Sequence, residues 1–322
     1  LYIFITVKKK VAIIVGGSGQ FGVTISNFLL KKKYKIVVTT RNVKNCRKKI
    51  SKNNDVHIEK LDIYNKIHID HILKKYNPKL VFYLAGQSSP KKSFYQKKET
   101  YRSNVIGCKN FLEIIKNNKI NCSFLNASSC EIYGNTKGKI KLNSPKRPIS
   151  PYGFAKLKSF EITKNFRIKH KLRTFNAIIF NTESIHRDKS FLIPKICIAA
   201  INAKRNNSKT EFGNLNVSRE WNWCEEQVKI LCEFLKKEPQ DFILSNGKSY
   251  TALQMVDFAF KFFNLNYKTY VLFNNKYLRK KDSKNKISDW KSCLKRNQIK
   301  RSVTVYGEKI IIKLIKNYLN DK

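Results

Sequence analysis

The amino-acid sequence predicts an α/β fold with a doubly wound parallel sheet. In the first half of the 322 residues, short β-branched runs alternate with longer amphipathic stretches, the pattern of successive strand–helix–strand units. A glycine-rich turn, GGSGQFG at 16–22, stands between the first of these runs and the first amphipathic stretch. Hydrophobic residues make up 42% of the chain, which is enough to build the core that such a sheet requires.

The predicted elements follow one another along the first 181 residues. Strands are expected at 10–17, 35–40, 56–63, 79–86, 122–129 and 175–181. Helices are expected over 20–33, around 67–76, over 101–118 and over 152–170, where apolar residues recur at helical spacing. After residue 181 the pattern becomes irregular, except that DFILSNG at 241–247 predicts a late strand that returns to the sheet.

This order of elements predicts two interleaved parts. Residues 1–181, with 222–248 returning to them, are expected to form the sheet domain, and 182–221 with 249–322 a smaller C-terminal lobe. Ligands of doubly wound sheets bind at the carboxyl ends of the strands. The lobe is therefore expected to close over that edge and to bind the substrate. No repeat or low-complexity linker separates the two parts.

The chain is strongly basic, with 66 Lys and Arg against 22 Asp and Glu. A net charge of +44 suggests an anionic partner such as nucleic acid, a membrane surface or a phosphorylated small molecule. The lysines are spread along the whole sequence, however, with no basic tail, zinc-finger spacing or RNA-recognition motif. We therefore expect a solvated basic surface and no nucleic-acid partner. No membrane anchor is expected either, because the apolar start LYIFITV is too short to span a bilayer.

The eight cysteines are scattered along the sequence. None forms a CxxC pair or lies near a His at metal-ligand spacing, so no metal site is expected. This distribution favours reduced thiols. Because reduced thiols are typical of cytoplasmic proteins, a cytoplasmic location is expected.

The glycine turn follows a predicted strand and opens a predicted helix, which indicates a Rossmann-type dinucleotide-binding domain. Gly16, Gly19 and Gly22 would permit a tight turn and bring a pyrophosphate close to the helix N-terminus. The second strand ends in TTRN, with no acidic residue to bind the ribose of NAD. Arg41 would instead meet the extra phosphate of NADP, or it is a solvated surface residue. Asp62 would contact the adenine, or it caps a helix.

The segment SPYGFAK places Tyr152 and Lys156 four residues apart, on one face of the predicted helix. An ammonium beside a phenol stabilises the phenolate, which would make Tyr152 a base near neutral pH. Ser129 ends the preceding strand with a hydroxyl that would hold a substrate oxygen. Glu131 follows two residues later, either as an active-site carboxylate or as a loop carboxylate that caps backbone N–H groups.

Together these features resemble the extended short-chain dehydrogenase/reductase family over essentially the whole chain. Further segments resemble the GDP-mannose 4,6-dehydratase family within it, in the NAD-dependent epimerase/dehydratase group. These segments are LAGQSSPKKSF (84–94), ASSCEIYG (127–134), FNTESIHRDKSFLIPKI (180–196), GNLNVSREW (213–221) and KYLRKKDS (276–283).

The resemblance implies a hydro-lyase, a sugar-nucleotide 4,6-dehydratase with tightly bound NADP that acts on GDP-mannose or a related GDP-hexose. It implies a homodimer or a homotetramer. The implied catalytic residues are Ser129, Glu131, Tyr152 and Lys156. The implied cofactor-binding residues are Gly16, Gly19, Gln20, Gly22, Arg41, Asp62, Leu84, Ala85, Gly86, Tyr152 and Lys156. The implied substrate-binding residues are Ser88, Asn181, Glu183, Leu192, Lys195, Arg219 and Arg279.

The chain departs from the family pattern at several positions. Thr182 stands where the family has His, Ile185 where it has Pro, and Cys130 where it has Ser. Lys280 and Asp282 also replace family residues. The alternatives are another NADP-dependent sugar-nucleotide epimerase or reductase of the same fold, and a non-catalytic basic protein that binds nucleic acid.

Overall fold

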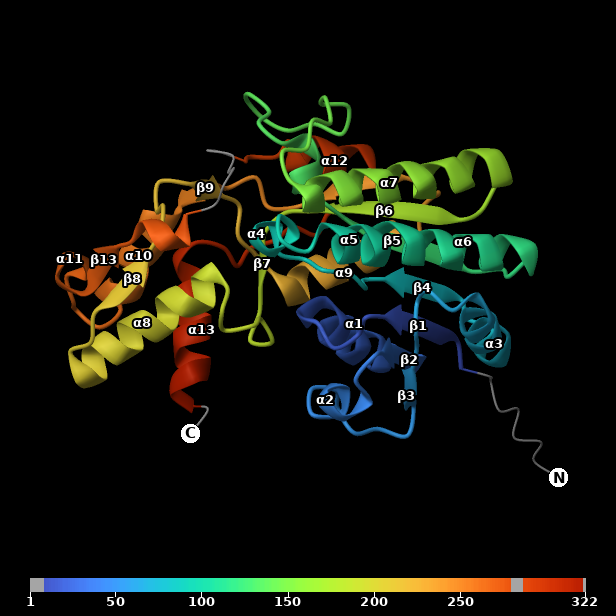
Figure 1. The fold of residues 1–322 in the computed structure, drawn as a ribbon, viewed down its shortest axis with the longest axis horizontal. Helices are drawn as coiled ribbons and strands as arrows, with labels where there is room; N and C mark the ends of the chain where they lie inside the picture. Colours follow the sequence, from blue (N-terminus) through green and yellow to red (C-terminus); the bar gives the residue numbers. More distant parts are fainter. Residues whose placement is uncertain (1–8, 279–285, 321–322) are drawn as a thin grey trace.

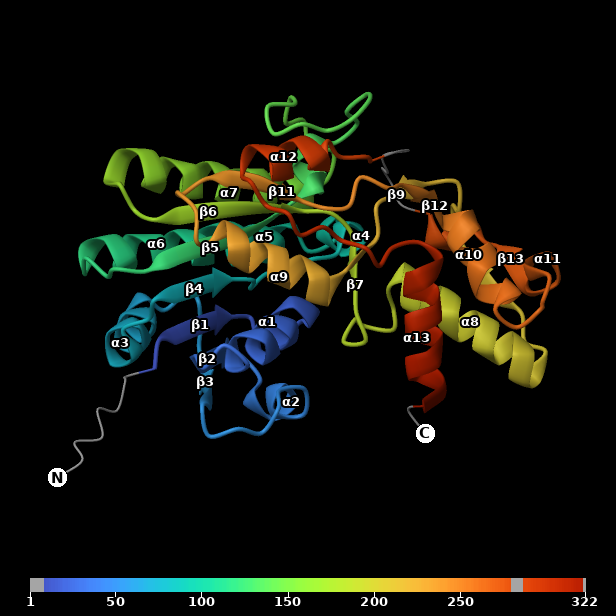
Figure 2. The same cartoon turned by 180° about the vertical axis from the view of Figure 1, so that it is seen from behind.

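The structure, a computed structural model, describes residues 9–278 and 286–320. Its centre is a seven-stranded sheet in the order β11-β6-β5-β4-β1-β2-β3, in which every neighbouring pair is parallel (Figure 1; β11 is labelled in Figure 2). The predicted doubly wound, Rossmann-type α/β sheet is confirmed. The strands are β1 (Val11–Val15), β2 (Lys35–Thr40), β3 (Val56–Lys60), β4 (Leu80–Tyr83), β5 (Ser123–Ser129), β6 (Thr174–Ile179) and β11 (Asp241–Leu244).

Helices cover both faces of the sheet because its strands are apolar on both sides. In β1, Ala12 and Ile14 pack into one hydrophobic core, whereas Ile13 and Val15 pack into another. The first core includes side chains of α1 (Gln20–Leu30) and α9 (Cys224–Phe234), and the second those of α3 (Lys66–Tyr76) and α6 (Gly107–Asn117). Smaller elements of this part are α2 (Val43–Arg47), α4 (Pro90–Ser93) and the 3₁₀ turn η2 (Cys130–Tyr133).

The helix predicted over 101–118 begins earlier and contains a π-helical turn. It consists of α5 (Lys97–Tyr101), the π-turn η1 (Arg102–Ile106) and α6. The hydroxyl of Tyr83 in β4 donates a hydrogen bond of 2.6 Å to the carbonyl oxygen of Ser103 inside this turn. A side chain that enters the helical hydrogen-bond ladder is a known cause of such irregularities, and it could not be read from the helix sequence itself.

Helix α7 (Pro151–His170) agrees with the predicted helix at 152–170 and fixes the YxxxK pair. Its start is well defined, because the Ser150 hydroxyl accepts a hydrogen bond of 3.1 Å from Gly153 N and Pro151 occupies the first turn. Tyr152 therefore lies in the first turn of the helix, at the carboxyl edge of the sheet.

The smaller lobe has its own hydrophobic core, formed mainly by α8 (Leu192–Asn206), α10 (Ala252–Lys261) and α13 (Glu308–Asn320). It lies beside the carboxyl edge of the sheet (Figure 2). Its short strands pair as β8 (Thr210–Phe212) with β13 (Val271–Phe273) and β9 (Ser218–Arg219) with β12 (Tyr250–Thr251), while β7 (Thr182–Glu183) pairs with β10 (Asn222–Trp223). The remaining elements are α11 (Tyr267–Tyr270), η3 (Asn275–Tyr277) and α12 (Trp290–Arg296).

The chain passes repeatedly between the two parts. As the sequence predicts, α9 and β11 return to the sheet. Helix α12 returns as well, because Trp290, Cys293, Ile299 and Val303 are buried in the core that contains α9. The hydrophobic packing thus differs from the predicted division, which assigns all of 249–322 to the lobe, and the division into two domains stays a prediction. No helix within the described residues is long and apolar enough to cross a membrane.

Candidate active site

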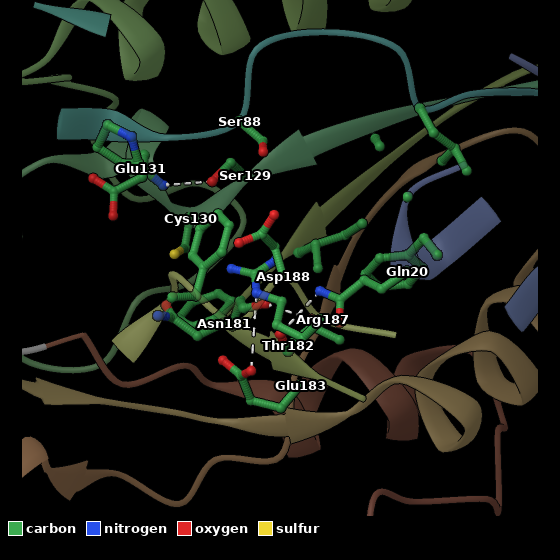
Figure 3. Close-up of a pocket in the computed structure, with 18 of the residues that line it drawn as sticks. Gln20, Ser88, Ser129, Cys130, Glu131, Asn181, Thr182, Glu183, Arg187 and Asp188 are labelled. Carbon is green, nitrogen blue, oxygen red and sulfur yellow. Dashed lines mark hydrogen bonds and ion pairs between the residues drawn. The ribbon is translucent and has the colours of Figure 1, made fainter. Parts of the chain in front are cut away.

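A pocket of about 490 Å³ lies where the lobe meets the carboxyl edge of the sheet (Figure 3). The glycine turn, the ends of β5 and β6, the start of α7 and the segment from β7 to α8 all contribute to its walls. Most of the residues proposed from the sequence line it together. These are Gly16, Gly19, Gln20, Gly22, Leu84, Ser88, Ser129, Glu131, Tyr152, Lys156, Asn181, Glu183, Leu192 and Arg219.

The glycine turn leaves room for a phosphate group. Gly16 has φ +79°, and a Cβ there would lie 2.7 Å from the Ala85 backbone. A Cβ at Gly19 would meet only the Gly16 carbonyl oxygen, at 3.9 Å, so the backbone there is open to the pocket. Gly19 is also the N-cap of α1 and provides no side-chain hydrogen bond. The N–H groups at the start of α1 are thus suited to an anion, and the turn fits a dinucleotide pyrophosphate.

The side chain of Gln20 joins α1 to the segment after β6. Its Nε2 donates a hydrogen bond of 3.0 Å to the Thr182 carbonyl oxygen, and its Oε1 accepts one of 3.0 Å from the Ser184 hydroxyl. Thr182, which departs from the family pattern, is also held by Gln227, whose Oε1 accepts from the Thr182 hydroxyl at 2.6 Å. The hydroxyl of Thr182 therefore has a hydrogen-bond partner inside the protein.

Ser129, Tyr152 and Lys156 come together at one wall of the pocket. Ser129 ends β5 and its hydroxyl accepts a hydrogen bond of 3.2 Å from Glu131 N. The Lys156 ammonium lies 5.8 Å from the centre of the Tyr152 ring and donates a hydrogen bond of 2.8 Å to the Ala127 carbonyl oxygen. Two elements, a strand end and a helix start, thus place a serine, a phenol and an ammonium side by side.

Burial controls the ionisation of this group. It raises the pKa of Tyr152 well above its ordinary value, although hydrogen bonding with Ser129 opposes the change. Burial also lowers the pKa of Lys156 to about 8. The sequence led us to expect that Lys156 would make the Tyr152 phenolate available near neutral pH. In the structure, burial of Tyr152 opposes the formation of this phenolate.

Glu131 lies at the start of η2 and lines the pocket. Its Oε2 is 2.8 Å from the Nζ of Lys286. The neighbouring Cys130 is buried among hydrophobic residues of the sheet core, and burial raises the pKa of its thiol to about 11. Cys130 is therefore a protonated core residue rather than a reactive thiolate. All eight cysteines are free thiols, and no cluster of His, Cys, Asp and Glu within residues 9–278 and 286–320 would hold a metal ion.

Several proposed residues do not line the pocket. The side chain of Arg41 is 79% exposed and forms an ion pair of 3.4 Å with Glu99. Asp62 accepts a hydrogen bond of 2.9 Å from Tyr64 N, and the N-cap of α3 is Asn65, so the helix-cap interpretation of Asp62 is wrong. Ala85 and Gly86 come directly after Leu84 in the sequence, and neither of them lines the pocket.

Lys195, proposed as a substrate contact, is turned toward the body of the lobe. Its Nζ donates a hydrogen bond of 2.5 Å to the Glu211 carbonyl oxygen and lies 4.1 Å from the centre of the Tyr277 ring. Arg219 lines the pocket, and its Nη1 donates a hydrogen bond of 2.7 Å to the Ser218 carbonyl oxygen. Arg279, Lys280 and Asp282 lie outside the described residues.

The comparisons with known proteins identify the family. A family model described as GDP-mannose 4,6 dehydratase matches residues 13–310. The chain belongs to the GDP-mannose 4,6-dehydratase family. The GDP-mannose 4,6-dehydratase of Vibrio cholerae is 30% identical over 266 residues, which cover 78% of this chain and 71% of that protein. The GDP-mannose 4,6 dehydratase of Cricetulus griseus is 31% identical over 269 residues, 78% of this chain and 72% of that protein.

Solved structures share the fold of this family member at lower identity. The dTDP-glucose 4,6-dehydratase of Bacillus anthracis in complex with NAD has a TM-score of 0.84 and is 18% identical, covering 97% of both chains. The Thermus thermophilus UDP-glucose 4-epimerase complex with NAD has a TM-score of 0.82, at 16% identity, and covers 95% of this chain and 99% of that one. The enzyme class predicted from the sequence, a sugar-nucleotide 4,6-dehydratase, is confirmed by the family match.

Arg187 lines the pocket but is not among the site residues predicted from the sequence. Its guanidinium lies 3.6 Å from the centre of the Phe191 ring. Its Nε is 3.8 Å from Oε2 of Glu183 (Figure 3). Arg187 and Asp188 both line the pocket and both belong to the segment FNTESIHRDKSF that carried the family resemblance. The resemblance of this segment could therefore have indicated them. Because the segment has no helical or strand periodicity, the direction of these side chains could not be predicted.

Glu183 is buried, and burial raises the pKa of its carboxyl to about 7. Below about pH 4.5 this carboxyl is protonated in both the folded and the unfolded chain. As the pH rises toward 7, the unfolded chain ionises first, so folding stability is lost, and the loss is complete above 7. The rise of the Glu183 pKa from 4.5 to about 7 corresponds to a loss of about 3 kcal/mol in the free energy of unfolding above pH 7.

Glu183→Gln is therefore expected to raise the free energy of unfolding by up to about 3 kcal/mol near pH 8 and to change it little near pH 4.5. Denaturant melts of the protein alone at both pH values measure this difference. Glu161→Gln, at an exposed carboxylate of α7, is the control and should show no such pH dependence. An equal effect of Glu183→Gln at both pH values would contradict the assignment.

Proposed function

We propose that the chain converts GDP-mannose into GDP-4-keto-6-deoxy-mannose, with NADP bound at the glycine turn. The observation that carries this proposal is the presence of Glu131 in the same pocket as Ser129, Tyr152 and Lys156. Oxidation of a sugar hydroxyl needs only the serine, the tyrosine and the lysine. Loss of water needs a further acid–base group, and Glu131 provides one.

The overall reaction removes one water molecule and leaves no net change in redox state. When bound, the nicotinamide dinucleotide supplies the acceptor and the donor of a hydride. Carbon 4 of the hexose is oxidised to a ketone, carbon 6 loses its hydroxyl, and carbon 6 ends as a methyl group. The solved neighbours with NAD support a nicotinamide cofactor of this kind.

The protein moves the protons. Tyr152 takes the proton of the carbon-4 hydroxyl, and Ser129 donates a hydrogen bond to the developing ketone oxygen. The ketone acidifies the proton at carbon 5, and Glu131 removes it. Glu131 then gives this proton to the hydroxyl that leaves carbon 6, so that the carboxylate is restored. Carbon 5 takes up one proton at the end, which balances the proton that Tyr152 took from the carbon-4 hydroxyl.

Two observations support NADP over NAD. No carboxylate follows β2 in the position that would bind the ribose hydroxyls, and Arg41 occupies the end of the strand instead. The exposed guanidinium of Arg41 is accessible to a ribose phosphate. Asp62, Ala85 and Gly86 remain proposed cofactor contacts at the ends of β3 and β4.

The substrate pyrophosphate would be held by guanidinium groups, which pair bidentately with phosphate oxygens. Arg219 lines the pocket, and Arg279 is proposed from the resemblance alone. Ser88, Asn181, Glu183 and Leu192 line the pocket and remain proposed substrate contacts, as does Lys195. We further propose a cytoplasmic homodimer or homotetramer whose partner is a GDP-hexose, with no nucleic-acid partner.

The test is incubation of the purified protein with GDP-mannose and added NADP or NAD. We expect a 4-keto-6-deoxy sugar nucleotide, faster with NADP, and no lasting accumulation of reduced nicotinamide. Accumulation of reduced nicotinamide, or only an inverted hydroxyl, would indicate a reductase or an epimerase. No turnover together with salt-sensitive binding of DNA or RNA would indicate the non-catalytic alternative.

A further inference from the structure

Lys286 lies directly behind the pocket carboxylate. Its Nζ is 2.8 Å from Oε2 of Glu131. The Lys286 side chain is 0% exposed, whereas the Glu131 side chain is 14% exposed and lines the pocket. Lys286 is not part of the pocket wall. Its ammonium therefore does not line the pocket itself and contacts the pocket wall at Glu131.

The backbone of Lys286 is held in place on both sides. Its N–H donates a hydrogen bond of 3.3 Å to the Ser218 carbonyl oxygen, just before Arg219. The next residues pair with Ile140, whose N–H donates to the Ile287 carbonyl oxygen at 2.7 Å and whose carbonyl accepts from Asp289 N at 2.8 Å. The segment thus bridges the loop after η2 and the strand β9.

The buried carboxylate of Glu220 fixes the same segment through hydrogen bonds. It accepts hydrogen bonds from the backbone N–H and the hydroxyl of Ser288, from the Ser245 hydroxyl, and from Gly247 N at 2.7 Å. These donors satisfy Glu220, which is 0% exposed. The position of Lys286 is therefore determined by a hydrogen-bonded frame and not by solvent.

A fully buried lysine needs a partner. Taking an ammonium out of water costs several kcal/mol, and lysine is almost never fully buried unless it is paired. Breaking such a pair by removing one partner leaves the other charge uncompensated. The contact with Glu131 is the ion pair that compensates the burial of Lys286 in the described part of the chain.

We propose that Lys286 is a positioning residue for the elimination step, which holds the Glu131 carboxylate charged and directed into the pocket. This inference rests on the proposed function, because Glu131 acts only when water is eliminated. The resemblance did not indicate Lys286, since it lies beyond the matched segment KYLRKKDS.

The ion pair favours both proton transfers of Glu131, the removal of the proton from carbon 5 and its release to the oxygen that leaves carbon 6. Before the reaction, Lys286 favours the carboxylate form, which is the form that can remove the proton from carbon 5. Once Glu131 has taken this proton, the Lys286 charge is buried without a counter-charge. Release of the proton to the oxygen leaving carbon 6 restores the pair. One C–H bond and one C–O bond break, a carbon–carbon double bond and water form, and Glu131 ends ionised.

Lys286→Met tests this role by replacing the ammonium with an uncharged chain of similar length. We expect kcat for product formation to fall by about 10- to 100-fold, as misplacement of a reacting group typically causes. The KM for GDP-mannose should stay within about threefold, because Lys286 does not line the pocket. Reduced nicotinamide should accumulate during turnover, since oxidation at carbon 4 continues while elimination is slow.

Lys286→Arg keeps a positive charge and is expected to recover part of the lost rate. Lys146→Met is the matched control, because the Lys146 ammonium is half-buried near Tyr133 but lies outside the pocket. It should turn over like the wild type. If Lys286→Met does not fold, as judged by its melting curve, Lys286→Gln replaces it, because the amide keeps a hydrogen-bond donor without the charge.

A double-mutant cycle separates positioning from a general structural role. If Lys286 acts through Glu131, adding Lys286→Met to Glu131→Gln should change the rate of elimination by no more than about twofold. An additional loss equal to that of the single variant would overturn the proposal, as would full turnover by Lys286→Met or Lys286→Gln. A wild type that forms no dehydrated product would instead overturn the proposed function, so the two failures are distinct.

Discussion

Glu131→Gln is expected to oxidise GDP-mannose at carbon 4 but to fail in the loss of water. The amide keeps the shape of the side chain and cannot take the proton from carbon 5. Ser129, Tyr152 and Lys156 remain in place, because their contacts with one another and with Ala127 do not involve the carboxylate. Formation of the dehydrated product should fall by about 100- to 10,000-fold, the range for loss of a general acid–base group.

The measurement follows nicotinamide absorbance and sugar-nucleotide products in a single turnover. Reduced nicotinamide should appear and persist in Glu131→Gln, whereas in the wild type it should be transient. Glu225→Gln is the control, because Glu225 is a partly buried carboxylate on α9 outside the pocket. Full product formation by Glu131→Gln would remove Glu131 from the mechanism.

Tyr152→Phe is expected to abolish the reaction before any oxidation occurs. The change removes the phenol oxygen that we propose takes the proton from the carbon-4 hydroxyl, and it leaves the ring in its buried place at the start of α7. Turnover should fall by about 100- to 10,000-fold, with no reduced nicotinamide at any time. This absence separates Tyr152→Phe from Glu131→Gln, in which reduced nicotinamide persists.

Substrate binding by Tyr152→Phe should remain close to that of the wild type, as measured by calorimetry with GDP-mannose. Tyr133→Phe is a matched control, because Tyr133 is a buried tyrosine three residues after Cys130 that does not line the pocket. Persistent oxidation by Tyr152→Phe would show that another group takes the first proton.

Local patterns carried most of what the sequence could predict. The glycine turn and the YxxxK pair depend on residues a few positions apart, so their geometry follows from the strand, turn and helix that contain them. Glu131 was assigned through a resemblance, because a carboxylate after a strand has no geometry of its own. The structure places all of these residues at one pocket, as their positions at the carboxyl ends of the strands require.

Side chains whose direction depends on distant contacts could not be predicted. Lys195 lies in the first turn of α8 near the pocket, yet its ammonium is drawn to the Glu211 carbonyl oxygen and the Tyr277 ring. The effect of burial on Tyr152 likewise depends on the packed fold rather than on its spacing from Lys156. Lys286 is 155 residues from Glu131 in sequence, and no periodicity connects the two.

The repeated passage of the chain between its two hydrophobic cores limits how the protein can be divided. The sheet cores include residues up to Phe180, α9 with β11, and the segment from Trp290 to Val303, whereas the lobe core includes the intervening segments and α13. No single cut separates these sets. The smaller lobe therefore cannot be exchanged between relatives as one contiguous block of sequence.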